Sequence, residues 1–195
     1  MTITPPINTA KLRIELYPTD VLKSKAKPLE LDSESWDEVR SVASRMIELM
    51  QGAHGIGLAA PQVGLSWRLF VAHVPADPDL DPEDEVPQFP DSCDGPCVFI
   101  NPVITNYAGD LEPYDEGCLS LPGITGEVNR PSIVTVKAID LEGNEVELTA
   151  SGLLARCWQH EIDHLDGVLI LDKMTQMSRL KNRSRIKAME KNAKR

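Results

Sequence analysis

The sequence predicts an α+β protein in which antiparallel β-sheets pack around a central helix that carries an HExxH pattern. Two observations indicate this class. Helical and β-type periodicities follow one another as helix, strands, helix and helix, without the regular alternation of a doubly wound sheet. The 195 residues are 42% hydrophobic and 26% charged, which suits one well-buried core. We therefore expect a single domain over residues 1–195.

The first predicted helix is amphipathic and spans Ser33 to Met50. Asp32 or Ser33 can cap its start, and Gly52 follows its end. Its apolar residues recur at intervals of three and four. They are Trp36, Val39, Val42, Ala43, Met46, Ile47 and Met50. One face of this helix is therefore expected to pack on the core.

Short β-type runs follow the first helix. They lie at Leu69–Val74, Val98–Ile104, Ile133–Ile139 and Glu145–Thr149. The last two are separated by a short polar turn that contains Gly143, which predicts a hairpin. We expect these strands to pair in the antiparallel sense.

Two further helices are predicted in the last third of the chain. One fits Gly152–Asp166 and stops at Gly167, and the other fits roughly Ser178–Ala193. The segment 174–195 contains eight bases and one acid, with charge on many faces and no apolar stripe. A solvated C-terminal helix or frayed tail is one interpretation, and a contact with a nucleic acid is the other.

Residues 75–96 differ in composition from the rest of the chain. They include six Pro, eight acids and no base, which is typical of a solvent-facing loop insertion. Cys93 and Cys97 lie at its end, but no second Cys or His pair follows at zinc-finger spacing. We interpret them as loop thiols.

Several classes of protein are excluded at this stage. The longest uncharged stretch, which ends at Trp67, contains four Gly and one Pro, so no membrane-spanning helix is expected. The N-terminus lacks the pattern of a secretory signal, and four cysteines are too few for a disulfide scaffold. Residues 1–173 carry 29 acids against 12 bases, so specific DNA binding is not expected. We expect a cytoplasmic protein, with an organelle as the alternative if a transit peptide has been removed.

The most informative pattern is His160-Glu161-Ile162-Asp163-His164, inside the second predicted helix. Four residues rotate the second histidine only about 40° from the first, so both imidazoles can bind one divalent ion. Glu161 lies about 100° round the helix, where it can accept a proton from a water beside the ion without being a ligand. Asp163 or Asp166 could support a ligating histidine, or could be an ordinary solvated acid.

A catalytic metal site needs a third protein ligand. No histidine follows His164, and His54 and His73 lie far upstream, where an ordinary surface or core role is expected. Cys118 is the best candidate, because it follows Gly117 after an apparent strand and turn, although a buried cysteine is the common alternative. We expect Cys157 to pack on the apolar side of its helix.

A glycine-rich, uncharged segment runs from Gly55 to Gly64. A helix precedes it and Pro61 interrupts it, which excludes a dinucleotide-binding loop. Its glycines allow close backbone approach, and Gln62 can donate a hydrogen bond to an oxyanion or can simply cap a packed turn.

Taken together, three stretches resemble the peptide deformylases, which remove the formyl group from the N-terminal methionine of nascent chains. They are Gly55–Gln62, Glu116–Ser120 and His160–Gly167, in the order that this family has them. The surrounding chain, from about Leu12 to Lys173, also fits the family arrangement of helix, strands and helix.

The resemblance implies a role for each matching residue. Cys118, His160 and His164 would hold Fe²⁺, for which Zn²⁺, Ni²⁺ or Co²⁺ could substitute. Glu161 would be the catalytic acid and base, and Gln62 and the Leu119 N–H would stabilise the oxyanion. Contacts to methionine would come from Ile56, Gly57, Gly117 and Leu119. Thr125 stands where many relatives have a basic residue, so the role of Arg130 stays open.

Two other functions fit the same residues. A metallopeptidase that cuts internal peptide bonds could use the same water and the same Glu161. A ribosome-binding or RNA-binding module could use a structural metal and the basic segment 174–195. The resemblance favours the deformylase, whose partners would be nascent N-formylmethionyl polypeptides and, through the basic segment, the ribosome.

Overall fold

A computed structural model describes residues 7–31, 36–77 and 87–193. Within these residues, the chain forms four α-helices and five strands, with short 3₁₀ turns between them. The helices are α1 (Trp36–Gly52), α2 (Gly152–Leu165), α3 (Ile170–Lys173) and α4 (Gln176–Asn192). The strands are β1 (Gly57–Ala59), β2 (Leu69–Ala72), β3 (Cys97–Gly117), β4 (Thr125–Ile139) and β5 (Glu145–Ser151).

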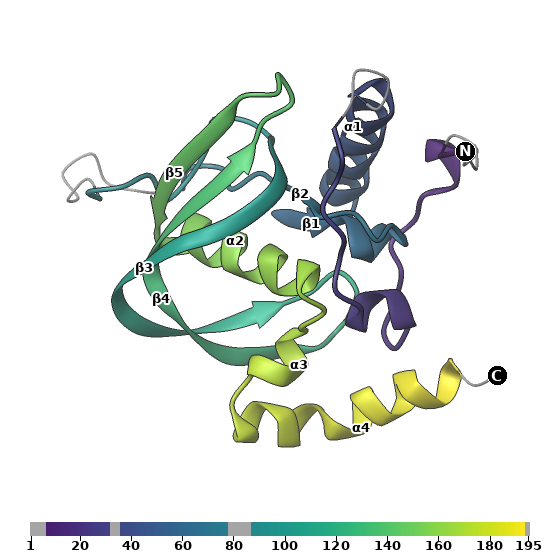
Figure 1. The fold of residues 1–195 in the computed structure, drawn as a ribbon. Coiled ribbons are helices and arrows are strands. Elements are labelled where there is room, and N and C mark those ends of the chain that lie inside the picture. Colours follow the sequence, from purple (N-terminus) through teal and green to yellow (C-terminus); the bar gives the residue numbers. More distant parts are fainter. Residues whose placement is uncertain (1–6, 32–35, 78–86, 194–195) are drawn as a thin grey trace.

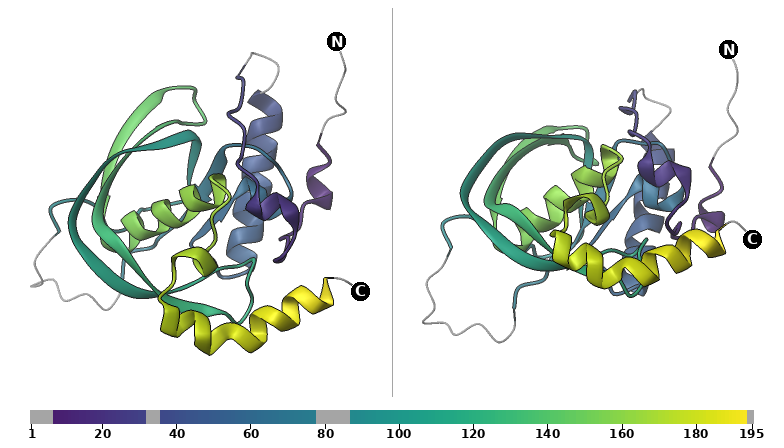
Figure 2. Two further views of the ribbon diagram at one scale, coloured as in Figure 1. Left: turned by 60° about the horizontal axis from the view of Figure 1, so that its bottom comes forward. Right: turned by 90° about the horizontal axis from the view of Figure 1, so that it is seen from below.

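The five strands form one antiparallel sheet in the order β1-β2-β3-β4-β5. Its register shifts three times along the β3–β4 pair, which bends these strands. Figures 1 and 2 show the result, in which β3, β4 and β5 curve around α2. Antiparallel pairing is as predicted, although one curved sheet takes the place of several.

Strands β3 and β4 are much longer than the sequence predicts. The predicted runs Val98–Ile104 and Ile133–Ile139 cover only one end of a ribbon that continues to Gly117 and back from Thr125. The missed part of β3 contains Asn, Gly, Asp and Pro, which have low β-propensity, and it is largely exposed. Pairing across the ribbon, rather than local preference, makes it a strand.

Helix α1 buries the face that its periodicity predicts. Val39, Val42, Ala43, Met46 and Met50 are all buried against β1 and β2. The predicted caps Asp32 and Ser33 lie outside the described residues. The segment after α1 differs from the expected turn, because residues 57–59 form edge strand β1 before a 3₁₀ turn begins at Ala60.

Helix α2 lies in the concave side of the sheet (Figure 1). Ten of its 14 residues are buried, including the thiol-bearing Cys157 and the aromatic Trp158. Trp158 packs at a tilt against Phe99, with ring centroids 5.0 Å apart. Gln159 donates to the Pro131 carbonyl at 2.9 Å, which ties the helix to β4. This packing fixes the rotation of α2 and therefore the direction of its polar face.

The described parts of segment 75–96 contain no helix or strand and no buried residue, but the end of the segment also contacts the fold. Residues 78–86 lie outside the described part of the chain. Beyond them, the Pro90 carbonyl accepts from Ser151 N–H at 2.8 Å, and the Asp91 carbonyl accepts from Leu154 N–H at 3.1 Å. Cys93 and Cys97 pack partly against the core beneath, as free thiols. This stretch therefore supports the first turn of α2.

Helix α4 docks on the start of β4, which corrects the expectation of a tail without a packing face. Ser178 and Asn182 are buried, and Ile186 and Met189 pack partly on the core. Asn182 Nδ2 donates to the Thr125 carbonyl at 2.7 Å. Hydroxyl and amide groups occupy the first half of this stripe, so hydrophobic periodicity does not reveal it. No helix within the described residues is long and apolar enough to span a membrane.

Candidate metal centre and pocket

Helix α2 places the two histidines of the HExxH pattern one turn apart. The ring centroids of His160 and His164 are 5.0 Å apart. His164 is almost fully buried, at 1% exposure. Burial lowers the pKa of His164 well below its usual value, which favours the neutral imidazole that a metal requires.

Cys118 reaches the same point from the end of β3. Its Sγ lies 3.2 Å from Nε2 of His164. One ligand atom from each of Cys118, His160 and His164 lies within 4.8 Å of the other two. The structure therefore brings together the three predicted ligands, although 46 residues separate Cys118 from His164.

Glu116, rather than an acid of α2, contacts His160. Its Oε2 lies 3.1 Å from His160 Nδ1. Asp163 and Asp166, the two acids considered from the sequence, have other partners. Asp163 pairs with Arg130 and Lys173, whereas Asp166 pairs with Arg68 and Lys25.

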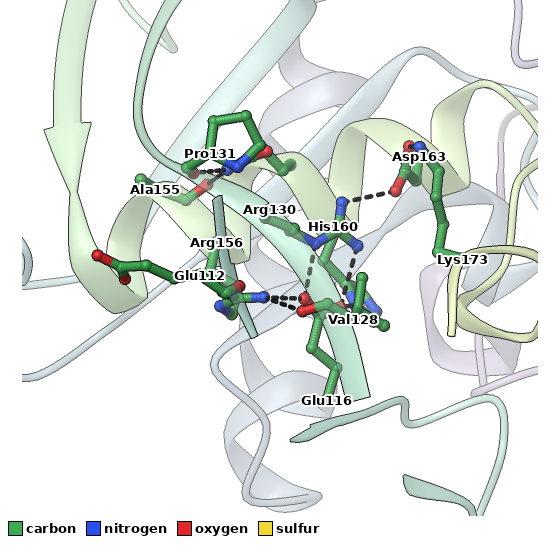
Figure 3. A network of polar contacts seen from close by, with 11 residues as sticks. Glu112, Glu116, Val128, Arg130, Pro131, Ala155, Arg156, His160, Asp163 and Lys173 are labelled. Carbon is green, nitrogen blue, oxygen red and sulfur yellow. Dashed lines mark hydrogen bonds and ion pairs between the residues drawn. The ribbon is translucent and has the colours of Figure 1, made fainter. Parts of the chain in front are cut away.

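Two buried arginines surround Glu116 (Figure 3). Arg130 contacts both carboxylate oxygens, at 2.6 and 2.9 Å, and Arg156 Nη1 contacts Oε1 at 2.8 Å. Burial raises the pKa of Glu116, but hydrogen bonds from His160 and Arg130 outweigh it and bring the pKa to about 2. The structure thus gives Arg130 a place and adds Arg156, which sequence reasoning missed. Arg156 is the one charged residue in the otherwise apolar stretch 153–158, which was the available signal.

Glu161 is buried at 3% exposure and faces the same centre. Burial raises the pKa of Glu161 to about 7. Among the described residues, none forms a hydrogen bond with its Oε2. Gly57 packs directly on this carboxyl group, where a Cβ would collide with it and would lie 2.9 Å from Cys157 Sγ.

Gln62 is held with its amide N–H groups toward the metal ligands. Its Oε1 accepts from Ala59 N–H at 2.8 Å, which fixes the orientation of the amide. Its Nε2 then lies 3.5 Å from Cys118 Sγ and 3.3 Å from Ser120 Oγ. Gln62 therefore caps a backbone group and also directs an amide donor toward Cys118.

A pocket of about 490 Å³ opens beside these groups. Its lining includes Cys118, His160, Glu161 and Gln62. The residues that the sequence predicts for substrate contact also line it, namely Ile56, Gly57, Gly117 and Leu119. The pocket thus joins a metal-ligand cluster, a buried carboxyl group and an apolar recess, a combination that suits hydrolysis of a small acyl group.

A family model described as polypeptide deformylase matches residues 11–180. The chain belongs to the peptide deformylase family. Enzymes of this family remove the formyl group from the N-terminal methionine of new polypeptides by hydrolysis, and this is the function of the present chain.

Curated deformylases are similar over nearly the whole chain. The peptide deformylase of Thermodesulfovibrio yellowstonii is 44% identical over 170 residues, which cover 87% of this chain and 93% of that protein. The Acinetobacter baumannii enzyme is 43% identical over 177 residues, which cover 91% and 90% respectively.

Solved deformylase structures share the fold. Peptide deformylase 1B of Arabidopsis thaliana, in complex with an inhibitor, superposes with a TM-score of 0.77 at 37% identity, covering 93% of this chain and 92% of that chain. The Synechococcus elongatus deformylase, in complex with actinonin, gives a TM-score of 0.70 at 39% identity, covering 91% and 85%. The family resemblance and the α+β class predicted from the sequence are therefore confirmed.

Proposed function

We propose that this deformylase holds one Fe²⁺ ion through Cys118 Sγ and the imidazoles of His160 and His164. The donor set supports a metal site, because one thiolate and two imidazoles are typical ligands of a divalent transition metal and leave a position for substrate. The separation of 3.2 Å between Cys118 Sγ and His164 Nε2 suits two donors on one ion. Zn²⁺, Ni²⁺ or Co²⁺ would fit the same donors.

When bound, such an ion acts as a Lewis acid and makes water a nucleophile near neutral pH. Glu161 supplies the proton transfers of the reaction. Its Oε2 takes a proton from the attacking water and later delivers it to the departing amine nitrogen, so that formate and a free amino terminus result. Burial and the raised pKa of about 7 support this role, because a proton carrier works best when its pKa is near the operating pH.

Gln62 and Leu119 would stabilise the negative charge that develops on the formyl oxygen. The Gln62 amide is preoriented by Ala59 N–H, so its Nε2–H can donate without reorganisation. The Leu119 backbone N–H follows directly after Cys118, at the rim of the same pocket. Donors of this kind typically contribute a few kcal/mol in the transition state.

The methionine side chain would occupy the apolar part of the pocket. Ile56, Gly57, Gly117 and Leu119 all line this pocket, which supports the contact that the family resemblance implies. An unbranched thioether suits a recess of irregular shape. The substrates would be nascent N-formylmethionyl polypeptides, so the enzyme would work in a cytoplasm or in an organelle that makes protein.

The remaining organisation follows from the same proposal. Residues 1–195 would form a single catalytic domain, in which segment 75–96 is an insertion. The basic surface of α4 would contact the ribosome. Exposed bases on this helix support that contact, namely Arg179, Lys181, Arg183, Arg185 and Lys187.

The convergence of Cys118 with the HExxH histidines carries this proposal, and formate release tests it. Protein purified without oxygen should contain about one iron per chain and should release formate from formyl-Met-Ala-Ser. It should leave a peptide with a blocked amino terminus and only internal peptide bonds intact. Absence of formate from fully loaded protein would refute the assignment.

Metal exchange tests the iron assignment separately. A thiolate ligand beside redox-active iron oxidises in air, so activity should decay with Fe²⁺ and persist with Ni²⁺. Equal decay with both ions would count against iron as the cause of the oxygen sensitivity.

A further inference from the structure

The Glu116 carboxylate lies at the centre of a saturated hydrogen-bond network. Its Oε1 accepts from Arg130 Nε at 2.6 Å and from Arg156 Nη1 at 2.8 Å. Its Oε2 accepts from Arg130 Nη2 at 2.9 Å and lies 3.1 Å from His160 Nδ1. A carboxylate offers about four acceptor sites, so this one is filled. Figure 3 shows these contacts converging on one side chain that is only 5% exposed.

The network dictates which nitrogen of His160 carries a proton. A carboxylate between two guanidinium groups is ionised and can only accept hydrogen bonds. His160 Nδ1 must therefore be the donor in its contact with Glu116. In the neutral imidazole that metal binding requires, this leaves Nε2 to supply a lone pair toward Cys118 and His164.

The two arginines approach Glu116 from different elements. Arg130 extends from β4 and also bonds Asp163 of α2 at 2.7 Å. Arg156 lies on α2 itself, one turn before His160. Arg156 and His160 therefore lie on the same face of the helix, and both contact the Glu116 carboxylate. Arg156 also donates to the Val128 carbonyl at 3.0 Å and to the Glu112 carbonyl at 2.7 Å. The carboxylate is thereby fixed relative to both the helix and the sheet.

Stability alone is a weak explanation for such a cluster. Removing several charges from water costs free energy that their mutual attraction often fails to recover, and apolar residues of similar volume are frequently as stabilising. A positional role accounts for the arrangement better, because among the described residues Glu116 pairs with the two arginines and, besides them, with His160, a proposed metal ligand.

We propose that Glu116 is a positioning residue for His160, and that Arg130 and Arg156 hold it in the orientation that directs His160 Nε2 to the ion. Glu116 touches neither ion nor substrate in this role. The inference rests on the proposed metal site and adds three residues to it. Glu116 lies in one of the three motif stretches, but the sequence assigns only Cys118, His160 and His164 to the metal.

The test measures metal retention as well as turnover. Enzyme loaded with Co²⁺ is mixed with excess EDTA, and the loss of the cobalt d–d absorption band gives the dissociation rate. Glu116→Gln keeps the size of the side chain but offers one oxygen where four donors need two. Glu112→Gln is the matched control, because it removes a charge from an exposed side chain on the same strand.

Loss of a partner that orients a metal ligand typically costs about 10- to 100-fold in metal affinity or activity. We expect Glu116→Gln to lose Co²⁺ faster by that factor, to shift the d–d band and to lower kcat while KM is unchanged. Glu116→Asp, which restores the charge, should recover part of the loss. The Co²⁺ dissociation rate and the kcat of Arg156→Met should lie between those of Glu116→Gln and those of the control Glu112→Gln.

Two results would overturn the inference. One is Co²⁺ retention and a d–d band in Glu116→Gln that match those of Glu112→Gln. The other is a rise in KM alone, which would mean that the network shapes the pocket and not the ligand. If Glu116→Gln does not fold, the inference is tested with Arg156→Met and Glu116→Asp. Co²⁺ retention and a d–d band that match those of Glu112→Gln, or a rise in KM alone, would then overturn it. Failure of the wild-type enzyme to bind Co²⁺ or release formate would refute the proposed function instead.

Discussion

Helices α2 and α4 have similar lengths, 14 and 17 residues, but opposite environments. In α2, ten residues are buried and the curved sheet surrounds them, whereas in α4 two are buried and the bases face solvent. Arg156, Gln159 and Asp163 of α2 therefore have fixed partners, and the buried Glu161 and His164 have shifted pKa values. The comparison shows that each buried charge of α2 acts through its own neighbours and its own pKa. The exposed bases of α4 can act only together, as a positively charged surface.

The largest effect should come from the buried helix. Glu161→Gln keeps the shape of the side chain but removes the group that carries the proton, so kcat should fall about 10²- to 10⁴-fold. The metal content should stay at the wild-type level, because Glu161 is proposed as base and not as ligand. Formate release and metal analysis on the same sample measure both quantities. Loss of the metal together with turnover would make Glu161 a ligand.

The outer helix should give the opposite pattern. Arg183→Glu with Lys187→Glu changes two exposed residues, so formate release from a short peptide should be unchanged. Ribosome binding should weaken, and the slope of log affinity against log salt should fall by about two. Lys11→Glu with Lys137→Glu makes the same charge change at exposed positions outside α4 and serves as control. If the two pairs of substitutions weaken ribosome binding equally, α4 is not the specific site of contact with the ribosome.

The same contrast separates what the sequence could predict from what it could not. The spacing of His160 and His164 is a local property of a helix, and the motif around Cys118 makes this residue the candidate for the third donor. The partner of His160 depends instead on how β3 lies beside α2, so the nearby Asp163 and Asp166 were considered while Glu116 was missed. With 30 acids and 20 bases in the chain, only the folded register selects the pairs among Glu116, Arg130 and Arg156.

The sequence predicts that α4 is a helix with a basic surface, but it does not predict the face by which α4 packs on the fold. That face contains Ser178 and Asn182, which pack closely against β4. Ser178 Oγ accepts a hydrogen bond from the Glu127 N–H, and Asn182 Nδ2 donates one to the Thr125 carbonyl. Gly126 lets this happen, because a Cβ there would come within 2.9 Å of Met174 and 3.1 Å of Ser178. Close approach between a strand and a helix far apart in sequence leaves no hydrophobic pattern to detect.

The smallest effect concerns the far end of α4, where Tyr17 donates to Glu190 at 2.8 Å. The pKa of Tyr17 is raised to about 12, above the usual value of 10.0. Burial is the largest cause, followed by the hydrogen bond with Glu190 and the negative charge of Glu190. The protonated phenol therefore stabilises the fold fully below pH 10, and this contribution is lost as pH rises through about 12.

Tyr17→Phe should accordingly lower the free energy of unfolding by about 1 kcal/mol at pH 8, and the difference from wild type should shrink above pH 10. Urea denaturation at pH 8 and pH 11 measures both values. Tyr114→Phe removes a hydroxyl from a ring that is 53% exposed and should leave stability unchanged. A difference that stays constant up to pH 12 would mean that the Tyr17 hydroxyl acts through packing rather than through its bond to Glu190. In that case the bond between Tyr17 and Glu190 would contribute nothing to the docking of α4.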